Sequence, residues 1–246
     1  WKLLQQIDTD PMPWLELNIN SNLGTKTKLI ERLSTSVKKL CDEDKLESFK
    51  LFTSLDTWGP RAEYTRTGLD LELWETNFHT YLTQTDSPIT FMVTFNLFCV
   101  TSFKGLLEKF LEWRTQYGWY DDKPNDKHRV RFDTPYLREP LQYDMNILPK
   151  EEYMPYMYDS LKFMEDNVDD ERSDKFTTLE YEKFKRVVDY MQESVYTDEK
   201  LIEGRRDFYN WFNELDDRRE ADFLSVFPEM MDFYKLCQTV NLTNPL

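Results

Sequence analysis

The chain has 246 residues, 40% of them hydrophobic, and a formal net charge of −15 at pH 7. This length suffices for one large domain with a substantial core. The acidic balance argues against a large interface with nucleic acid or an anionic membrane, because both need clustered Lys and Arg. No stretch approaches the roughly 20 apolar residues of a membrane helix, and the first residues lack the order of a signal peptide. We therefore expect a soluble, cytoplasmic protein without a membrane partner.

The cysteines and histidines give no pattern of a metal site. Cys41, Cys99 and Cys237 are far apart in the sequence and form no CxxC pair, so neither a disulfide framework nor a zinc site is indicated. We expect reduced thiols in the core. His79 and His128 have no neighbouring Cys or carboxylate at the spacing of metal ligands, and a structural role is expected for both.

The first part of the chain alternates short apolar runs with longer amphipathic stretches, as expected for parallel strands joined by crossover helices. Three such units leading into a fourth strand predict an α/β fold with a parallel sheet or part of a (β/α) barrel. A polar surface loop is expected at 119–128. Strands are expected at 14–20, 49–54, 89–96 and 129–137, and helices at 25–40, 69–82 and 102–117, the last with Ser102 as its N-cap.

The pattern changes near residue 150, beyond which every apolar stretch has helical spacing. A charged segment at 168–175 is expected to be a solvated linker. We therefore predict an α/β domain over 1–150 and a helical C-terminal extension over 151–246. The helices of the extension are expected at 151–167, 177–192, 205–219 and 227–237.

Polar residues follow each predicted strand, where parallel α/β folds bind their ligands. The alternative is that these residues form turns and helix caps. The residues concerned are Asn20, Ser21 and Asn22 after the first strand, Ser54 and Asp56 after the second, Asn96 after the third, and Asp133, Thr134 and Tyr136 after the fourth.

The segment SLDTWGPRAEYTR, residues 54–66, resembles a ligand-binding signature of radical S-adenosylmethionine (radical SAM) enzymes. A Ser-x-Asp at the end of a strand, here Ser54 and Asp56, is followed by the turn Gly59-Pro60 and by an Arg, here Arg66, that ends a Tyr-x-Arg run. In that family the Ser and Arg contact the methionine part of the cofactor. Independently of the family, a guanidinium is a planar fork suited to a carboxylate, and the alternative for Arg66 is a surface salt bridge.

A second segment is similar to the same family. Asn20-Ser21-Asn22 looks like the Thr-Asn-Gly that ends the third barrel strand, although Ser21 replaces Thr and Leu23 replaces Gly. The resemblance covers residues 1–150 and implies that the four strands are strands three to six of a six-stranded partial barrel. It implies that Asn20, Asn22, Ser54, Asp56, Arg66 and Asn96 lie around S-adenosylmethionine. From side-chain chemistry, Asp56 is expected either to orient Arg66 or to cap its loop in an Asx-turn, and Asn96 either to meet the ribose or adenine or to cap its loop.

The extension resembles the C-terminal part of phage and bacterial radical SAM proteins. The CxxxCxxC motif that holds the family's 4Fe–4S cluster, and the Gly-Gly-Glu-Pro segment, do not occur in the sequence. We therefore expect a fragment whose complete form would use a cluster, a reductant and S-adenosylmethionine on an unknown substrate, the given chain being inactive. The alternative is a non-catalytic scaffold or protein-binding domain. Both motifs in the coding sequence upstream of Trp1 would favour the enzyme.

The missing strands of such a barrel would leave an apolar sheet edge at 15–20 or its neighbour. Exposed edges invite pairing with another chain. Self-association through this edge is therefore expected.

Overall fold

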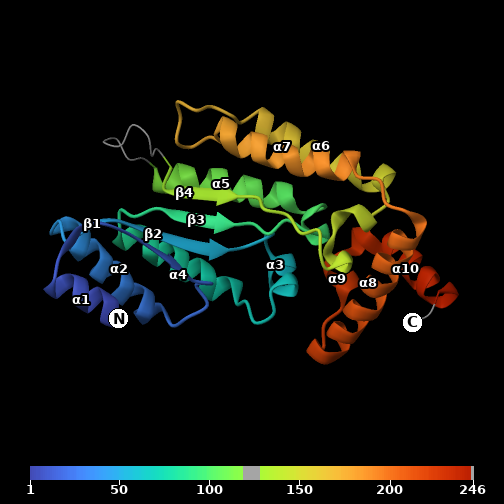
Figure 1. Cartoon of the computed structure of the whole chain (residues 1–246), viewed down its shortest axis with the longest axis horizontal. Coiled ribbons are helices and arrows are strands. Elements are labelled where there is room, and N and C mark those ends of the chain that lie inside the picture. Colours follow the sequence, from blue (N-terminus) through green and yellow to red (C-terminus); the bar gives the residue numbers. More distant parts are fainter. Residues whose placement is uncertain (119–127, 245–246) are drawn as a thin grey trace.

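The computed structural model describes residues 1–118 and 128–244. In this part of the chain four parallel strands form one sheet in the order β1-β2-β3-β4 (Figure 1). The α/β class and the parallel sheet that the sequence predicted are confirmed. The strands are β1 (Met12–Asn20), β2 (Leu46–Ser54), β3 (Ile89–Met92) and β4 (Val130–Asp133).

The three crossover helices lie on one face of the sheet (Figure 1). They are α2 (Thr27–Asp42), α4 (Leu71–Gln84) and α5 (Phe103–Tyr117). Burial along the strands agrees: Phe49 and Leu51 of β2 are buried against these helices, whereas the alternating Lys50 and Phe52 are half-buried on the opposite face. Because side chains alternate across a strand, the second face is the more open one, and we call it the open face.

Three short α-helices of the described part of the chain were not predicted, the last of them, after residue 220, being α9 (Phe223–Val226). The helix α1 (Lys2–Thr9) buries Leu4 and Ile7 against α2. The helix α3 (Pro60–Thr65) begins after Gly59, whose φ of 71° is in the left-handed region that glycine adopts readily. Ser102 does occupy the N-cap position of α5, but its hydroxyl donates to the carbonyl of Phe98 and does not cap the helix.

Helices dominate the chain after β4. The pair α6 and α7 lies alongside α5 and β4, and α8 packs against α10 at the end of the molecule where the chain terminates (Figure 1). Their bounds are α6 (Lys150–Glu165), α7 (Thr178–Glu193), α8 (Asp198–Arg219), α9 (Phe223–Val226) and α10 (Met231–Thr243), with 3-10 turns η1 (Leu97–Cys99), η2 (Leu141–Tyr143), η3 (Met145–Ile147) and η4 (Pro228–Met230).

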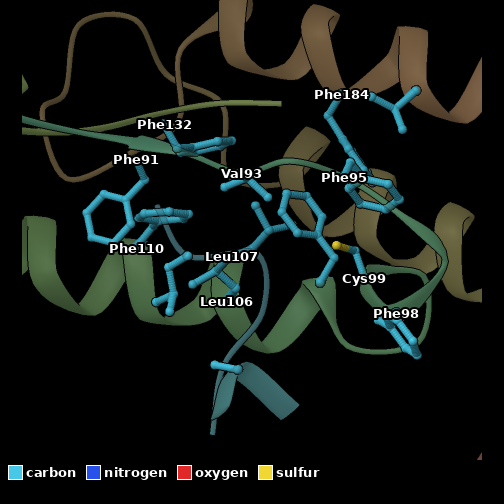
Figure 2. Close-up of a cluster of buried hydrophobic side chains, with 14 of the residues drawn as sticks. Phe91, Val93, Phe95, Phe98, Cys99, Leu106, Leu107, Phe110, Phe132 and Phe184 are labelled. Carbon is cyan, nitrogen blue, oxygen red and sulfur yellow. The ribbon is translucent and has the colours of Figure 1, made fainter. Parts of the chain in front are cut away.

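An aromatic core joins the sheet to the helices. Phe110 of α5 stacks on Phe132 of β4 with ring centroids 4.5 Å apart (Figure 2). The ring centroids of Phe95 and of Phe184 of α7 are 5.7 Å apart. Beyond the sheet, the ring centroid of Phe98 lies 4.9 Å from that of Phe212 of α8. Buried residues from both sides of position 150 therefore belong to one hydrophobic cluster, and the expected extension shares its core with the α/β part.

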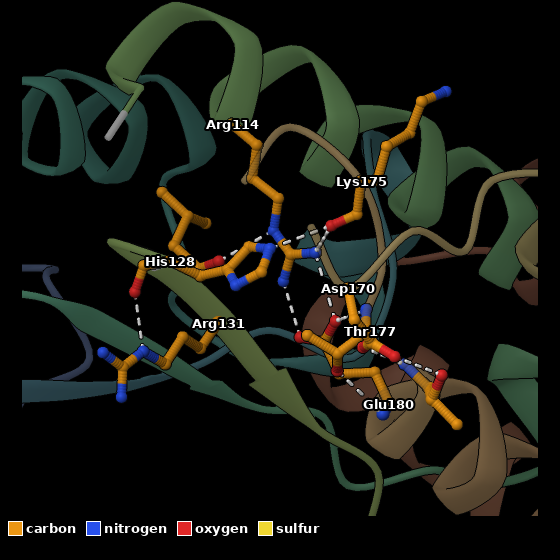
Figure 3. A network of polar contacts seen from close by, with 9 residues as sticks. Arg114, His128, Arg131, Asp170, Lys175, Thr177 and Glu180 are labelled. Atoms are coloured by element: carbon orange, nitrogen blue, oxygen red, sulfur yellow. Dashed lines mark hydrogen bonds and ion pairs between the residues drawn. The ribbon is translucent and has the colours of Figure 1, made fainter. Parts of the chain in front are cut away.

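A buried ion pair fastens α7 to the sheet (Figure 3). Arg114 of α5 donates through Nη2 to Oε1 of Glu180 at 2.5 Å and through Nη1 to Oε2 at 3.1 Å. The exposed fractions of the two side chains are 1% and 9%. Arg114 also donates from Nε to the carbonyl of Val130 and from Nη1 to that of Lys175. The contact therefore ties α5, β4 and the start of α7 together.

The segment expected to be a solvated linker is partly folded onto this network. The carbonyl of Lys175 accepts from Arg114 and lies 3.1 Å from Nε2 of His128. Ser173 is buried, whereas Arg172 and Asp174 form an exposed ion pair. Most of the loop expected at 119–128 lies outside the described residues.

The cysteines occupy apolar surroundings. Cys99 and Cys237 are buried and Cys41 is half-buried. Burial raises the pKa of the Cys99 thiol well above its usual value, so this sulfur stays protonated and weakly nucleophilic. Among the described helices, none combines the length and apolar character needed to cross a membrane.

Candidate functional site

The carboxyl ends of the strands bring several predicted residues to one end of the open face. Ser54 at the end of β2 is level with Met92 of β3, which is level with Asp133 of β4. Asn20 at the end of β1 is level with Phe52, two residues before Ser54. Side chains at the ends of adjacent parallel strands therefore share one rim, as the sequence predicted.

Asp56 and Arg66 form the best-defined contact of this rim. Nη2 of Arg66 donates to Oδ1 of Asp56 at 2.9 Å, and the backbone N–H of Thr94 donates to the same oxygen at 2.8 Å. The side chain of Asp56 is 8% exposed and that of Arg66 30%. Asp56 thus joins the loop after β2 to the end of β3, and it fixes one side of the guanidinium.

The electrostatics of this pair follow from its burial. Burial raises the pKa of the Asp56 carboxyl from its usual value, while the charge and hydrogen bond of Arg66 and the N–H of Thr94 oppose that rise. A guanidinium is always charged, so Arg66 is the counter-charge that makes a buried carboxylate tolerable here.

Arg66 has donor capacity that Asp56 does not use. Its Nε is buried and has no hydrogen-bond partner within residues 1–118 and 128–244. A buried donor without a partner costs about 1–3 kcal/mol. A guanidinium held by Asp56, with Ser54 at the end of the adjoining strand β2, is a donor set that suits an anionic or carboxylate group.

Asn96 is occupied by local structure. Its Oδ1 accepts from the N–H of Phe98 and its Nδ2 donates to the carbonyl of Thr94, while the Asn96 N–H donates to Sγ of Cys99. The side chain is 5% exposed. The helix-cap alternative therefore describes the contacts of Asn96 in the structure, and a contact with a ligand stays a prediction.

The loop after β1 is also built from local turns. Oδ1 of Asn22 accepts from the N–H of Gly24, and Oγ of Ser21 accepts from the N–H of Leu23. Leu23 has a φ of 53°, in the left-handed region that favours glycine. Its side chain is fully buried, which anchors the loop despite the strained backbone.

Two contacts at this end of the molecule were not predicted. Buried Asn77 of α4 donates from Nδ2 to the carbonyls of Leu23 and Thr25, both at 2.7 Å, and so holds the loop after β1. Nζ of Lys183 in α7 lies 3.0 Å from Oδ1 of Asp133. A polar residue on the apolar side of an amphipathic helix was the available signal for Asn77. Lys183 carried no signal, because its partner is distant in the sequence.

The described residues do not fit an iron–sulfur cluster. No group of three or more His, Cys, Asp or Glu side chains that could hold a metal lies within the described ranges. Cys99 is enclosed by the core. The thiolates of a cluster would have to come from outside the described residues.

Comparison of the chain with protein-family models, with curated proteins and with solved structures returns no match. The assignment of a family therefore depends on the resemblance of individual segments and on the chemistry of the rim.

Proposed function

We propose that the chain is part of a radical SAM enzyme and that its rim binds the methionine part of S-adenosylmethionine. Arg66 would bind the cofactor carboxylate, Ser54 would hydrogen-bond the amine or carboxylate, and Asp56 would orient Arg66. The observation that carries the proposal is the guanidinium of Arg66, which is held on one side by Asp56 and belongs to a side chain that is 30% exposed.

The backbone at Leu23 supports the resemblance of the loop after β1. The family has Gly where this chain has Leu23, and the φ of 53° at this position is one that Gly adopts without cost. Leu23 thus occupies a backbone conformation that favours Gly, the residue that the family has here. Asn22 and Asn20 would lie near the cofactor from this side.

The one-sided sheet supports a barrel-like origin. All-parallel sheets are normally covered on both faces, whereas here the crossover helices α2, α4 and α5 cover one (Figure 1). In a partial barrel the helices lie outside and the opposite face lines the interior. Strands three to six of such a barrel would correspond to β1–β4, and the open face would then form part of the inner wall.

The complete enzyme would need an iron–sulfur cluster whose ligands the described residues do not supply. A 4Fe–4S cluster with a reductant supplies the electron that cleaves S-adenosylmethionine and starts radical chemistry on a substrate. The role of the described residues is to bind and orient the cofactor. Lys50, Arg131 and Asp133 on the open face would face the substrate, whose identity stays open.

The test is titration of S-adenosylmethionine into the chain, followed by calorimetry and by backbone NMR. Binding should perturb amides at the ends of β2 and β3. Replacing Arg66 with Ala removes a charge-assisted contact of roughly 1.5–3 kcal/mol, so the dissociation constant should rise by about one to two powers of ten.

Arg218→Ala is the matched control, because this Arg is 71% exposed and pairs only with Glu214 of its own helix in the described part of the chain. The control should bind the cofactor as tightly as the unchanged chain. If the folded wild-type chain shows no saturable binding, or if Arg66→Ala binds equally well, the proposed cofactor site is wrong and the non-catalytic scaffold is favoured.

A further inference from the structure

The outer edge of β1 is free in the described part of the chain. β1 lies at the end of the sheet and pairs only with β2 there. Edge strands present unpaired N–H and C=O groups, and natural proteins usually shorten, cover or charge them. Pro13 and the shift of register between Met12 and Glu16 protect the first half of β1 from pairing. The regular second half, from Glu16 to Asn20, has a single charged residue, Glu16, and is the part of the edge that can pair.

The ladder identifies which backbone groups point outward. The N–H of Ser21 donates to the carbonyl of Phe52 at 2.8 Å. In a parallel pair alternate residues direct both their N–H and their C=O to the same neighbour. Leu17, Ile19 and Ser21 therefore point toward β2, and Glu16, Asn18 and Asn20 direct their backbone groups away from the sheet.

We propose that this edge pairs with the same edge of a second copy of the chain, in an antiparallel arrangement centred on Asn18. In this register Asn18 faces Asn18 of the second copy, and Glu16 faces Asn20. All three residues have outward backbone groups, so each facing pair exchanges two N–H to O=C bonds. In a complete barrel another strand would occupy this edge, so the pairing is proposed for the given chain by itself, and it does not use the residues of the proposed cofactor site.

The side chains are self-complementary in the same register. Glu16, Asn18 and Asn20 are exposed on the open face, whereas Leu17 and Ile19 are half-buried on the helix-covered face. Leu17 of one copy then lies opposite Ile19 of the other, and apolar side chains meet apolar ones. Glu16 meets the amide of Asn20, so no like charges oppose one another across the strands.

The net charge sets the expected salt dependence. Each chain carries −15, and two such chains repel at long range. Salt at about 0.1–0.15 M screens charges that are separated by more than about 8–10 Å, so it weakens this repulsion. The hydrogen bonds of the ladder are much shorter and are little affected, and the dissociation constant of the dimer should therefore fall as ionic strength rises.

Cross-linking tests the register. The Cα atoms of a hydrogen-bonded antiparallel pair lie about 5.5 Å apart, within the range of a disulfide of about 4.4–6.8 Å. Asn18→Cys should therefore form a disulfide dimer under mild oxidation. Asn20→Cys is the matched control. In this register the Cys at position 20 of the second copy lies opposite Glu16, four residues or about 14 Å away along the strand at about 3.4 Å per residue, and should not cross-link.

A backbone variant tests the ladder itself. Asn18→Pro removes an outward N–H that β2 does not use, and proline is tolerated on the solvent side of edge strands. Light scattering should find a dimer for the wild-type chain and for Asn18→Ala, and a monomer for Asn18→Pro. At low concentration, where the wild-type chain also dissociates, the thermal midpoints of wild type and Asn18→Pro should agree. A wild-type monomer at high concentration and high salt, or equal cross-linking of the two cysteine variants, would overturn the proposal.

Discussion

The buried pair of Arg114 and Glu180 offers the sharpest test of what holds α7 to the sheet. Glu180→Leu would leave the guanidinium of Arg114 almost fully buried without its counter-charge. Breaking a buried pair by removing one partner costs about 3–5 kcal/mol. The free energy of unfolding, from urea denaturation, should fall by that amount. Glu214→Leu removes a carboxylate from an exposed pair with Arg218 and should cost less than about 1 kcal/mol.

The double variant Arg114→Leu with Glu180→Leu separates the pair from its surroundings. It should lose much less than the sum of the single losses, because no buried charge is left alone. Some loss should remain, since the carbonyls of Val130 and Lys175 lose their donor and an unpaired buried group costs about 1–3 kcal/mol. A loss for Glu180→Leu as small as that for Glu214→Leu would refute this account of the contact. So would a loss in the double variant equal to the sum of the losses in Arg114→Leu and Glu180→Leu.

Two further predictions concern packing and pH. A Cβ on Gly204 of α8 would lie 2.6 Å from Cγ2 of Ile147, whereas one on Gly105 of α5 would meet nothing within 4 Å. Gly204→Ala should therefore destabilise by about 1–3 kcal/mol and Gly105→Ala should stabilise by about 0.5–1 kcal/mol, and the reverse order in thermal unfolding would contradict the packing. Burial, helped by Arg114, lowers the pKa of His128 from its usual 6.5, so the unfolded chain binds a proton more readily. The free energy of unfolding should fall as pH drops below about 6.5, and His128→Gln should reduce this slope. An unchanged slope would exclude His128 as its source.

The sheet and its crossover helices were predictable because their signals are local. Alternation of apolar residues in β2 and helical spacing in α2 both report one buried face. The helix α1 was missed, because it has only two buried residues, Leu4 and Ile7. The third predicted strand was too long: regular pairing ends at Met92, and beyond it Phe95 forms only an isolated bridge with Tyr136.

Long-range polar contacts were not predictable in the same way. In the sequence, Arg114 is one of several charged residues of an amphipathic helix, and nothing distinguishes it from the others. Its partner Glu180 lies 66 positions away. The contact between Asp56 and Arg66 spans ten positions, and the order of residues in the segment suggested it. Its completion by the backbone N–H of Thr94 had no sequence signal, because every residue except proline carries that group.

The placement of the helices explains why two different sites can be proposed on one small sheet. With α2, α4 and α5 on a single face, the opposite face is not covered by these crossover helices (Figure 1), and β1 pairs only with β2 in the described part of the chain. The rim presents side-chain donors such as Arg66, which suit a small anionic ligand. The edge presents backbone groups at Asn18, which suit another strand. Because one site depends on a guanidinium and the other on a peptide N–H, Arg66→Ala should leave the dimer intact, and Asn18→Pro should leave the contact of Arg66 with Asp56 intact.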